Sequence, residues 1–257
     1  MLRDLFAYRN FIRNIVLKDL KLRYQASVLG FLWSLLNPLM MLAMYTVVFS
    51  TIMRVPTESN FTFFLFSGLM PWIFCSGSVM ASTGAITGNA SLIRKVHFPH
   101  ETLPVATVLF NFAQLVLALL VVVPGLVLMT GARLTWMAAL AIPLLLLHLV
   151  FTVGLAFAIS ALTTVFRDVA HFTEVAIMLL FWATPIVYPP EMAPHALQIW
   201  FRASPLAGFT ICYQDLLVHH RLPEVGLLST LVLWTAAALL VGHAVFRRLG
   251  RSFAEAV

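Results

Sequence analysis

The chain has 257 residues, of which 61% are hydrophobic and 10% are charged. Soluble globular domains carry about 25% charged residues, so this composition excludes that class and indicates a membrane protein with several spans. The net charge is +6, but the basic residues cluster between apolar runs. That clustering is typical of membrane orientation and not of nucleic-acid binding.

The first 24 residues predict an amphipathic helix lying in the membrane interface. Apolar side chains recur at helical spacing, at positions 5, 8, 12, 15, 16 and 20, and cations lie toward another face. The segment lacks the uninterrupted apolar core of a cleaved signal peptide. A solvated charged extension remains the alternative. The cations expected near lipid head groups are Arg9, Arg13, Lys21 and Arg23.

Six apolar runs are long enough to be membrane-spanning helices, because about 20 helical residues cross a hydrocarbon core. We therefore expect an all-α membrane protein that forms a single transmembrane domain over residues 1–257. The expected spans are residues 28–53, 61–87, 104–130, 136–166, 172–188 and 225–246.

The positions of Lys and Arg predict the orientation, because cytoplasmic flanks retain positive charge. With six spans both termini share one side, and twelve of the 16 basic residues fall on that side. The other four are Arg54, Arg133, Arg202 and Arg221. Both termini and the connection between the second and third spans are therefore expected in the cytoplasm.

That connection, RKVHFPHETLP, has two histidines and a glutamate, which first suggest a metal or catalytic loop. Pro99 lies between His97 and His100 and opposes a continuous helix, and the order H-x-x-H-E matches no zinc pattern. No glycine is followed by lysine, so a P-loop is excluded. We expect no catalytic, metal-binding or cofactor-binding residue in this chain. His148 and His243 are interpreted as satisfied polar residues or interface anchors.

The acidic residues avoid the predicted spans, with the exception of Glu174. Transporters coupled to protons or ions need buried ionisable groups. The energy for transport is therefore expected from another protein. Glu174 either pairs with Arg167, reaches the interface, or contacts a polar substrate.

Several motifs resemble, in order, those of ABC-2 type permeases that export polysaccharides. The likeness covers nearly the whole chain. The motifs are KLRYQASVLGFLWSLLNPLMMLAMYTVVFS (21–50), SLIRKVHFPHETLP (91–104), FRD (166–168), FWATPIVYPPEMAP (181–194), and SPLAGF followed by YQDLL (204–217).

The resemblance implies a homodimer in the bacterial inner membrane, joined to two copies of an ATPase subunit that binds ATP and Mg. The implied substrate is a lipid-linked polysaccharide, such as an undecaprenyl-pyrophosphate-linked O-antigen. It also implies a cytoplasmic coupling helix over residues 91–101 and external gate helices over 189–223. The residues expected to contact the ATPase are Arg94, Lys95, His97, Phe98, Glu101, Arg167 and Asp168. Alternatively, Arg94 and Lys95 serve only to set the topology.

Similar exporters line their channel mainly with the first and fifth spans, and both spans carry stripes of aromatic and polar residues. The expected lining is Trp33, Asn37, Met41 and Tyr45 in the first span, and Glu174, Met178, Phe181, Trp182 and Tyr188 in the fifth. Ordinary helix packing and aromatic anchoring at the interface are the alternatives.

Three other functions stay open at this point. The chain could be an ABC-2 permease for a smaller lipid or drug, a membrane-embedded glycan-processing enzyme, or an assembly scaffold. An enzyme would need several charged groups converging on one site, and a scaffold gives no reason for polar stripes inside spans.

Overall fold

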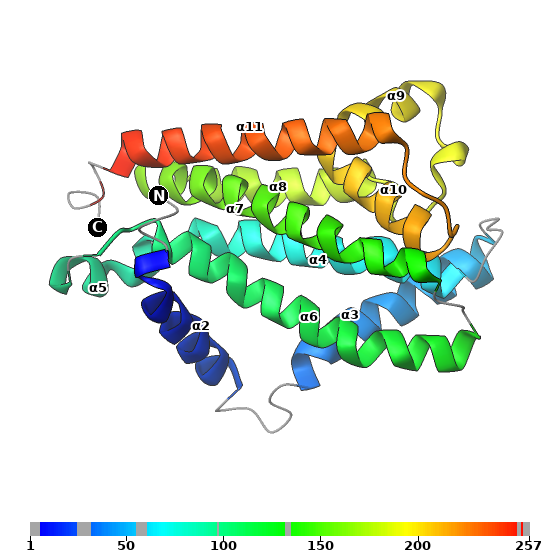
Figure 1. Cartoon of the computed structure of the whole chain (residues 1–257), viewed down its shortest axis with the longest axis horizontal. Coiled ribbons are helices and arrows are strands. Elements are labelled where there is room, and N and C mark those ends of the chain that lie inside the picture. The colour runs from blue at the N-terminus through cyan, green and yellow to red at the C-terminus, as the bar shows by residue number, and fades with distance from the viewer. Residues whose placement is uncertain are drawn as a thin grey trace.

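A computed structural model describes residues 6–24, 32–54, 61–96, 98–131, 135–250 and 253. All regular secondary structure among these residues is helical, which confirms the expected all-α class (Figure 1). The longer helices are α2 (Arg9–Tyr24), α3 (Leu32–Tyr45), α4 (Phe61–Thr83), α6 (Thr102–Thr130), α7 (Ala141–Val165), α8 (Val169–Trp182), α10 (Pro205–Leu217) and α11 (Val225–Leu249).

Shorter helical pieces join these helices. A π-helical segment, η1 (Thr46–Ile52), continues α3. The other pieces are η2 (Thr87–Asn89), α5 (Ala90–Lys95), η3 (Trp136–Leu140), η4 (Pro190–Met192) and α9 (His195–Ala203). The helix α5 lies at the end of the bundle where α11 finishes, and α9 and α10 lie at the opposite end (Figure 1).

Five stretches of the described chain are long and apolar enough to cross a membrane: Leu35–Ile52, Phe61–Thr83, Thr102–Met129, Trp136–Val165 and Val225–Leu249. The remaining apolar helix, α8, has 14 residues, about 21 Å at 1.5 Å per residue, against a hydrocarbon core of about 30 Å. It ends at Trp182, inside the predicted range 172–188. Pro185 opposes its continuation, because proline lacks an N–H group and disfavours helix at the preceding residue.

Helix α4 occupies the centre of the bundle, in contact with α3, α6, α7, α8 and α10. Its buried side chains are distributed around all its faces, from Phe63 and Phe64 to Trp72 and Phe74. A helix that is apolar all round is suited to such a position. The other long helices pack on α4 or on one another, and all of them except α10 leave another face exposed.

Helices α7 and α11 form the most extensive helix pair, and their backbones touch at two glycines. A Cβ atom built on Gly154 would lie 2.5 Å from the carbonyl carbon of Ala238. A Cβ atom built on Gly242 would meet the carbonyl oxygen of Gly154. Only glycine permits this approach, which is a common way to pack helices in membranes.

Candidate functional site

Helix α2 presents an apolar face to the protein and cations to its surroundings. Ile12 is buried and packs in a cluster that includes Val105 of α6. The predicted head-group cations Arg9, Arg13 and Lys21 are exposed. Arg23 lies on the same helix, but its side chain is outside the described set. The arrangement suits a helix at an interface, and the lipid contact stays a prediction.

The segment expected to couple the chain to an ATPase contains a shorter helix than the range 91–101 predicted. Helix α5 ends at Lys95, and Val96 is extended, with φ −130° and ψ 135°. Arg94 and Lys95 form the last turn of α5, and both are exposed. His97 lies outside the described residues. The two cations therefore project from the end of the bundle at a helix terminus.

Phe98 faces the protein interior, unlike these cations. Its side chain is 5% exposed and belongs to a cluster with Ile12, Phe246 and Phe253. Its ring centroid lies 4.9 Å from that of Phe11. Phe98 is thus positioned to hold the segment on the bundle, and its expected contact with an ATPase stays a prediction.

The remaining predicted coupling residues are close to helix starts. Glu101 is half-buried and directly precedes α6. Arg167 and Asp168 are exposed in the turn between α7 and α8. This turn lies at the same end of the bundle as α5 (Figure 1). The described members of the predicted set therefore lie at one end of the bundle, and their contact with an ATPase stays a prediction.

The first predicted channel stripe lies along α3. Trp33, Asn37 and Met41 are exposed there, and Tyr45 is half-buried at the last residue of the helix. An exposed amide on a helix within lipid would lack hydrogen-bond partners. Asn37 is therefore a candidate for contact with a polar group, and its role in the channel stays a prediction.

The second predicted stripe lies along α8 and meets the first at one pair of rings. Tyr45 stacks on Phe181, with centroids 5.8 Å apart and planes 28° apart. Phe181 is buried and also packs edge-on against Trp72 of α4, at 5.7 Å. Trp182 is 54% exposed. Glu174 and Met178 are also exposed on α8.

Beyond Trp182 the backbone stops being helical while it stays inside the protein. Thr184, Pro185, Ile186 and Val187 are all buried. Non-helical backbone at membrane depth is tolerated where protein surrounds it and its polar groups have partners. The hydroxyl of Tyr188, which is half-buried, donates to the carbonyl oxygen of Trp182 at 2.8 Å.

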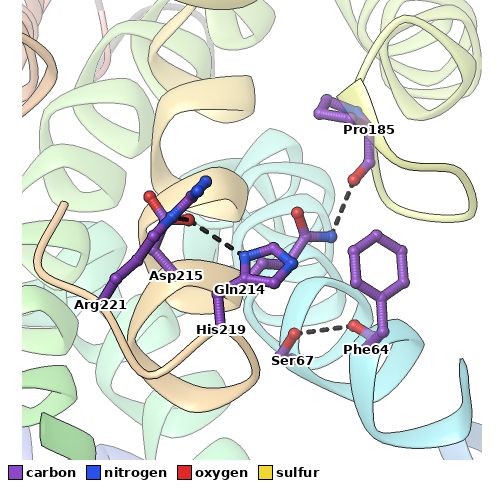
Figure 2. Close-up of polar contacts among 7 residues, drawn as sticks. All are labelled: Phe64, Ser67, Pro185, Gln214, Asp215, His219 and Arg221. Carbon is purple, nitrogen blue, oxygen red and sulfur yellow. Dashed lines mark hydrogen bonds and ion pairs between the residues drawn. The ribbon is translucent and has the colours of Figure 1, made fainter. Parts of the chain in front are cut away.

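A side chain from α10 supplies another of these partners. The Nε2 atom of Gln214 donates to the carbonyl oxygen of Pro185 at 2.9 Å (Figure 2). Gly68 of α4 leaves room for this contact, since a Cβ atom built there would lie 3.3 Å from that nitrogen. On the same helix, the Ser67 hydroxyl donates to the carbonyl oxygen of Phe64 at 2.7 Å. Gln214 thus satisfies a backbone acceptor at the broken end of α8.

Next to Gln214, the carboxylate of Asp215 holds the chain that leaves α10. Arg221 Nε donates to its Oδ1 atom at 2.7 Å, and His219 Nδ1 lies 3.1 Å from the same oxygen (Figure 2). The Asp215 side chain is 7% exposed. A nearly buried carboxylate requires such partners. These two contacts hold the segment between α10 and α11 against the end of α10.

His148 of α7 does not fit the expectation of a satisfied polar residue. Neither ring nitrogen has a hydrogen-bond partner among the described residues. Its ring instead stacks on Phe209 of α10, with centroids 4.1 Å apart and planes 10° apart. The imidazole acts here as a flat packing group between α7 and α10.

Sequence reasoning missed Gln214, Asp215 and Arg221 as residues with a role. The signal was the adjacent Gln and Asp of YQDLL inside an otherwise apolar stretch. Their partners Pro185 and Arg221 could not be read from that pattern. No group of three or more His, Cys, Asp or Glu side chains among the described residues could hold a metal ion.

The chain also resembles known proteins along its whole length. Residues 11–218 match the family described as ABC-2 type transporter. The O-antigen export system permease protein RfbA of Myxococcus xanthus is 34% identical over 260 residues, which cover 100% of this chain and 99% of the relative. The protein of that name in Klebsiella pneumoniae is 33% identical over 241 residues, or 93% and 91% of the two chains. The polysialic acid transport protein KpsM of Escherichia coli is 24% identical over 248 residues, or 92% of each. The resemblance inferred from the motifs is confirmed, and the chain belongs to the ABC-2 type transporter family.

Proposed function

We propose that this chain is the membrane subunit of an ATP-driven exporter, which moves a lipid-linked polysaccharide across the bacterial inner membrane. The substrate class is an undecaprenyl-pyrophosphate-linked O-antigen or a similar surface glycan. The observation that carries the proposal is the 34% identity with an O-antigen export permease over the entire chain. The lower identity with a polysialic acid transport protein supports the broader class of polysaccharides.

We further propose six membrane crossings with both termini in the cytoplasm. Helix α8 is the short crossing, and the buried residues after Trp182 complete its path. The last turn of α11 carries Arg247 and Arg248, and α5 at the same end carries Arg94 and Lys95. These cations support a cytoplasmic location for that end.

ATP hydrolysis belongs, in this proposal, to a separate subunit present in two copies, which binds ATP and Mg. The exposed cations Arg94 and Lys95 and the exposed Arg167 and Asp168 form the docking surface. Phe98 fixes this surface to the bundle. A displacement of the ATPase is then transmitted to α6 and not absorbed by a loose connection.

The glycan path runs between two copies of the chain. The exposed stripe of α3 and the exposed stripe of α8 face this path, and Tyr45 and Trp182 lie near its external end. Sugar hydroxyls need hydrogen-bond partners, and the C–H faces of sugars pack on aromatic rings. Helices α9 and α10 restrict the exit. Because α10 is anchored through Gln214 and Asp215, it forms the fixed part of that restriction.

The proposal is tested by purifying the chain with its ATPase and measuring hydrolysis in nanodiscs. We expect a stable complex whose ATPase activity rises when the lipid-linked glycan is added. A chain that binds no ATPase, or a complex that a smaller lipid stimulates equally well, contradicts the proposed function.

The docking surface is tested by reversing both charges, Arg94→Glu with Lys95→Glu. We expect the variant to reach the membrane but to lose glycan export and glycan-stimulated hydrolysis. The matched control reverses Arg247 and Arg248, which lie at the same end and outside the docking surface. Equal losses in both double variants would indicate an effect on topology and not on docking.

A further inference from the structure

A polar cavity of about 570 Å³ lies at the end of the bundle where α9 and α10 meet α11. Its size is within the usual range of small-molecule sites, roughly 300 to 1,000 Å³. The Nε1 atom of Trp234 on α11 donates to the carbonyl oxygen of Ala203 at 2.9 Å, which connects two of its walls. Charged side chains from four segments line it: Glu191, Arg202, Asp215, Arg221 and Glu224.

The charges in this cavity divide into a fixed pair and three others. Asp215 and Arg221 are bonded to each other on one side. Glu191, Arg202 and Glu224 are exposed, and the structure gives none of them an ion pair among the described residues. The guanidinium of Arg202 and the carboxylates of Glu191 and Glu224 therefore line the cavity and are available to hydrogen-bond a ligand.

This mixture of charges restricts the chemistry of a ligand. A small ion of either sign would be attracted by part of this lining and repelled by the rest, because three carboxylates and two guanidinium groups line the same cavity. An apolar ligand would leave these groups without water or partners. A neutral molecule with several hydroxyl groups satisfies both kinds, because a hydroxyl donates to a carboxylate and accepts from a guanidinium.

We propose that this cavity is a binding site for one or two neutral sugar units, held between Arg202 and the carboxylates of Glu191 and Glu224. The choice of a glycan as the source of these units rests on the proposed export function. The cavity lies at the opposite end of the bundle from α5, which is the external end in the proposed orientation. The three side chains proposed to hold the sugar are exposed, and the contacts are accordingly weak and reversible.

The site is tested with the full-length chain in nanodiscs and methyl glycosides of neutral hexoses as probes. Binding is detected by saturation-transfer difference NMR. We expect a signal for the native chain that falls about tenfold in the double variant Arg202→Gln with Glu224→Gln, because each change removes a charge-assisted hydrogen bond. The control Arg54→Gln removes an exposed cation outside the cavity and should keep the signal.

Three results would overturn the proposal. They are the absence of a signal with the native chain, an equal signal with the double variant, and displacement of the sugar by glycerophosphoethanolamine at lower concentration. The last result would assign the cavity to a zwitterionic lipid head group. Thermal unfolding checks that each variant is folded, and Glu191→Gln serves as an independent variant if the double variant is not. Failure to bind sugar leaves the export function standing, because ATPase association and glycan-stimulated hydrolysis are measured separately.

Discussion

The helix pairs α7–α11 and α3–α8 are packed in opposite ways. Helices α7 and α11 touch through their backbones at Gly154 and Gly242. Helices α3 and α8 meet through the rings of Tyr45 and Phe181, and large parts of both stay exposed. The first pair uses small residues to close a contact within the chain. The α3–α8 pair leaves polar and aromatic side chains exposed, where they are available for contacts with molecules other than this chain.

This difference separates stability from function along the same bundle. A backbone contact leaves no space for another side chain, so the α7–α11 pair behaves as one unit. The exposed faces of α3 and α8 contribute little packing within the chain, and changes there should affect transport before they affect folding. The following three changes test this separation.

The largest effect on stability is expected from Gly242→Ala, in the contact between α7 and α11. The added Cβ atom would meet the carbonyl oxygen of Gly154, so the two helices must move apart. We expect a loss of about 3 kcal/mol in the free energy of unfolding, seen as a fall in Tm on the order of 10 °C.

The matched control is Gly125→Ala in α6, where an added Cβ atom meets nothing within 4 Å. Alanine is the better helix former, so this variant should be as stable as the native chain or more stable. If both variants unfold at the same temperature, the backbone contact between α7 and α11 does not contribute to stability as we expect.

An intermediate effect is expected from Gln214→Leu, at the point where α10 supports the end of α8. The change keeps the side chain's approximate size but leaves the buried carbonyl oxygen of Pro185 without its donor. We expect the free energy of unfolding to fall by about 1 to 3 kcal/mol. We also expect the backbone amides of residues 183–188 to exchange hydrogen faster.

Gln198→Leu provides the comparison for this change. Its Nε2 atom donates to the carbonyl oxygen of Ala193 at the same distance, 2.9 Å, in a more exposed helix. In the Gln198→Leu variant the free energy of unfolding should fall by less than about 1 kcal/mol. Unchanged exchange in 183–188 of the Gln214 variant would show that the broken end of α8 is held by other contacts.

The smallest effect on stability, with a larger effect on transport, is expected from Tyr45→Ala with Trp182→Ala. The change removes three ring contacts, Tyr45–Phe49, Tyr45–Phe181 and Phe181–Trp182. Because Tyr45 is half-buried and Trp182 is exposed, we expect the free energy of unfolding to fall by only about 1 kcal/mol in total, while glycan export falls several-fold in an assembled transporter. Leu120→Ala removes an exposed apolar side chain from α6 and should leave export unchanged. Loss of the assembled complex, with normal export per remaining complex, would favour a packing role for the two rings.

Local pattern was sufficient to predict the class of the fold and most of its long helices. Apolar runs bounded by charge have the length of membrane spans, and this signal is present in the residues themselves. The run 172–188 was misleading in its last part. Ile186 and Val187 are apolar and buried, but the backbone there is not helical. Hydropathy reports burial and cannot distinguish a helix from an irregular segment enclosed by protein.

The contacts that hold the ends of these helices depend on partners distant in the sequence. Gln214 and Pro185 are 29 residues apart, and no spacing rule connects them. Gly154 and Gly242 give a weak signal, because isolated glycines in helices are unfavourable and often have a packing reason. Which glycines touch becomes evident only when α7 and α11 are placed side by side. The exposed stripe residues were found by spacing, and their role in conduction stays a prediction.

The buried position of Phe98 has a consequence for how the coupling segment can change. The connection between α5 and α6 covers residues 96–101, and Phe98 fixes it near its middle. An insertion on either side of Phe98 would shift that ring out of the cluster that joins α2 and α11. Substitutions at the exposed position Lys95 of α5 do not disturb this cluster, whereas Leu92 and Ile93 of the same helix are half-buried against it. The surface of α5 can therefore diversify to suit different ATPases, while the length of the connection must stay constant.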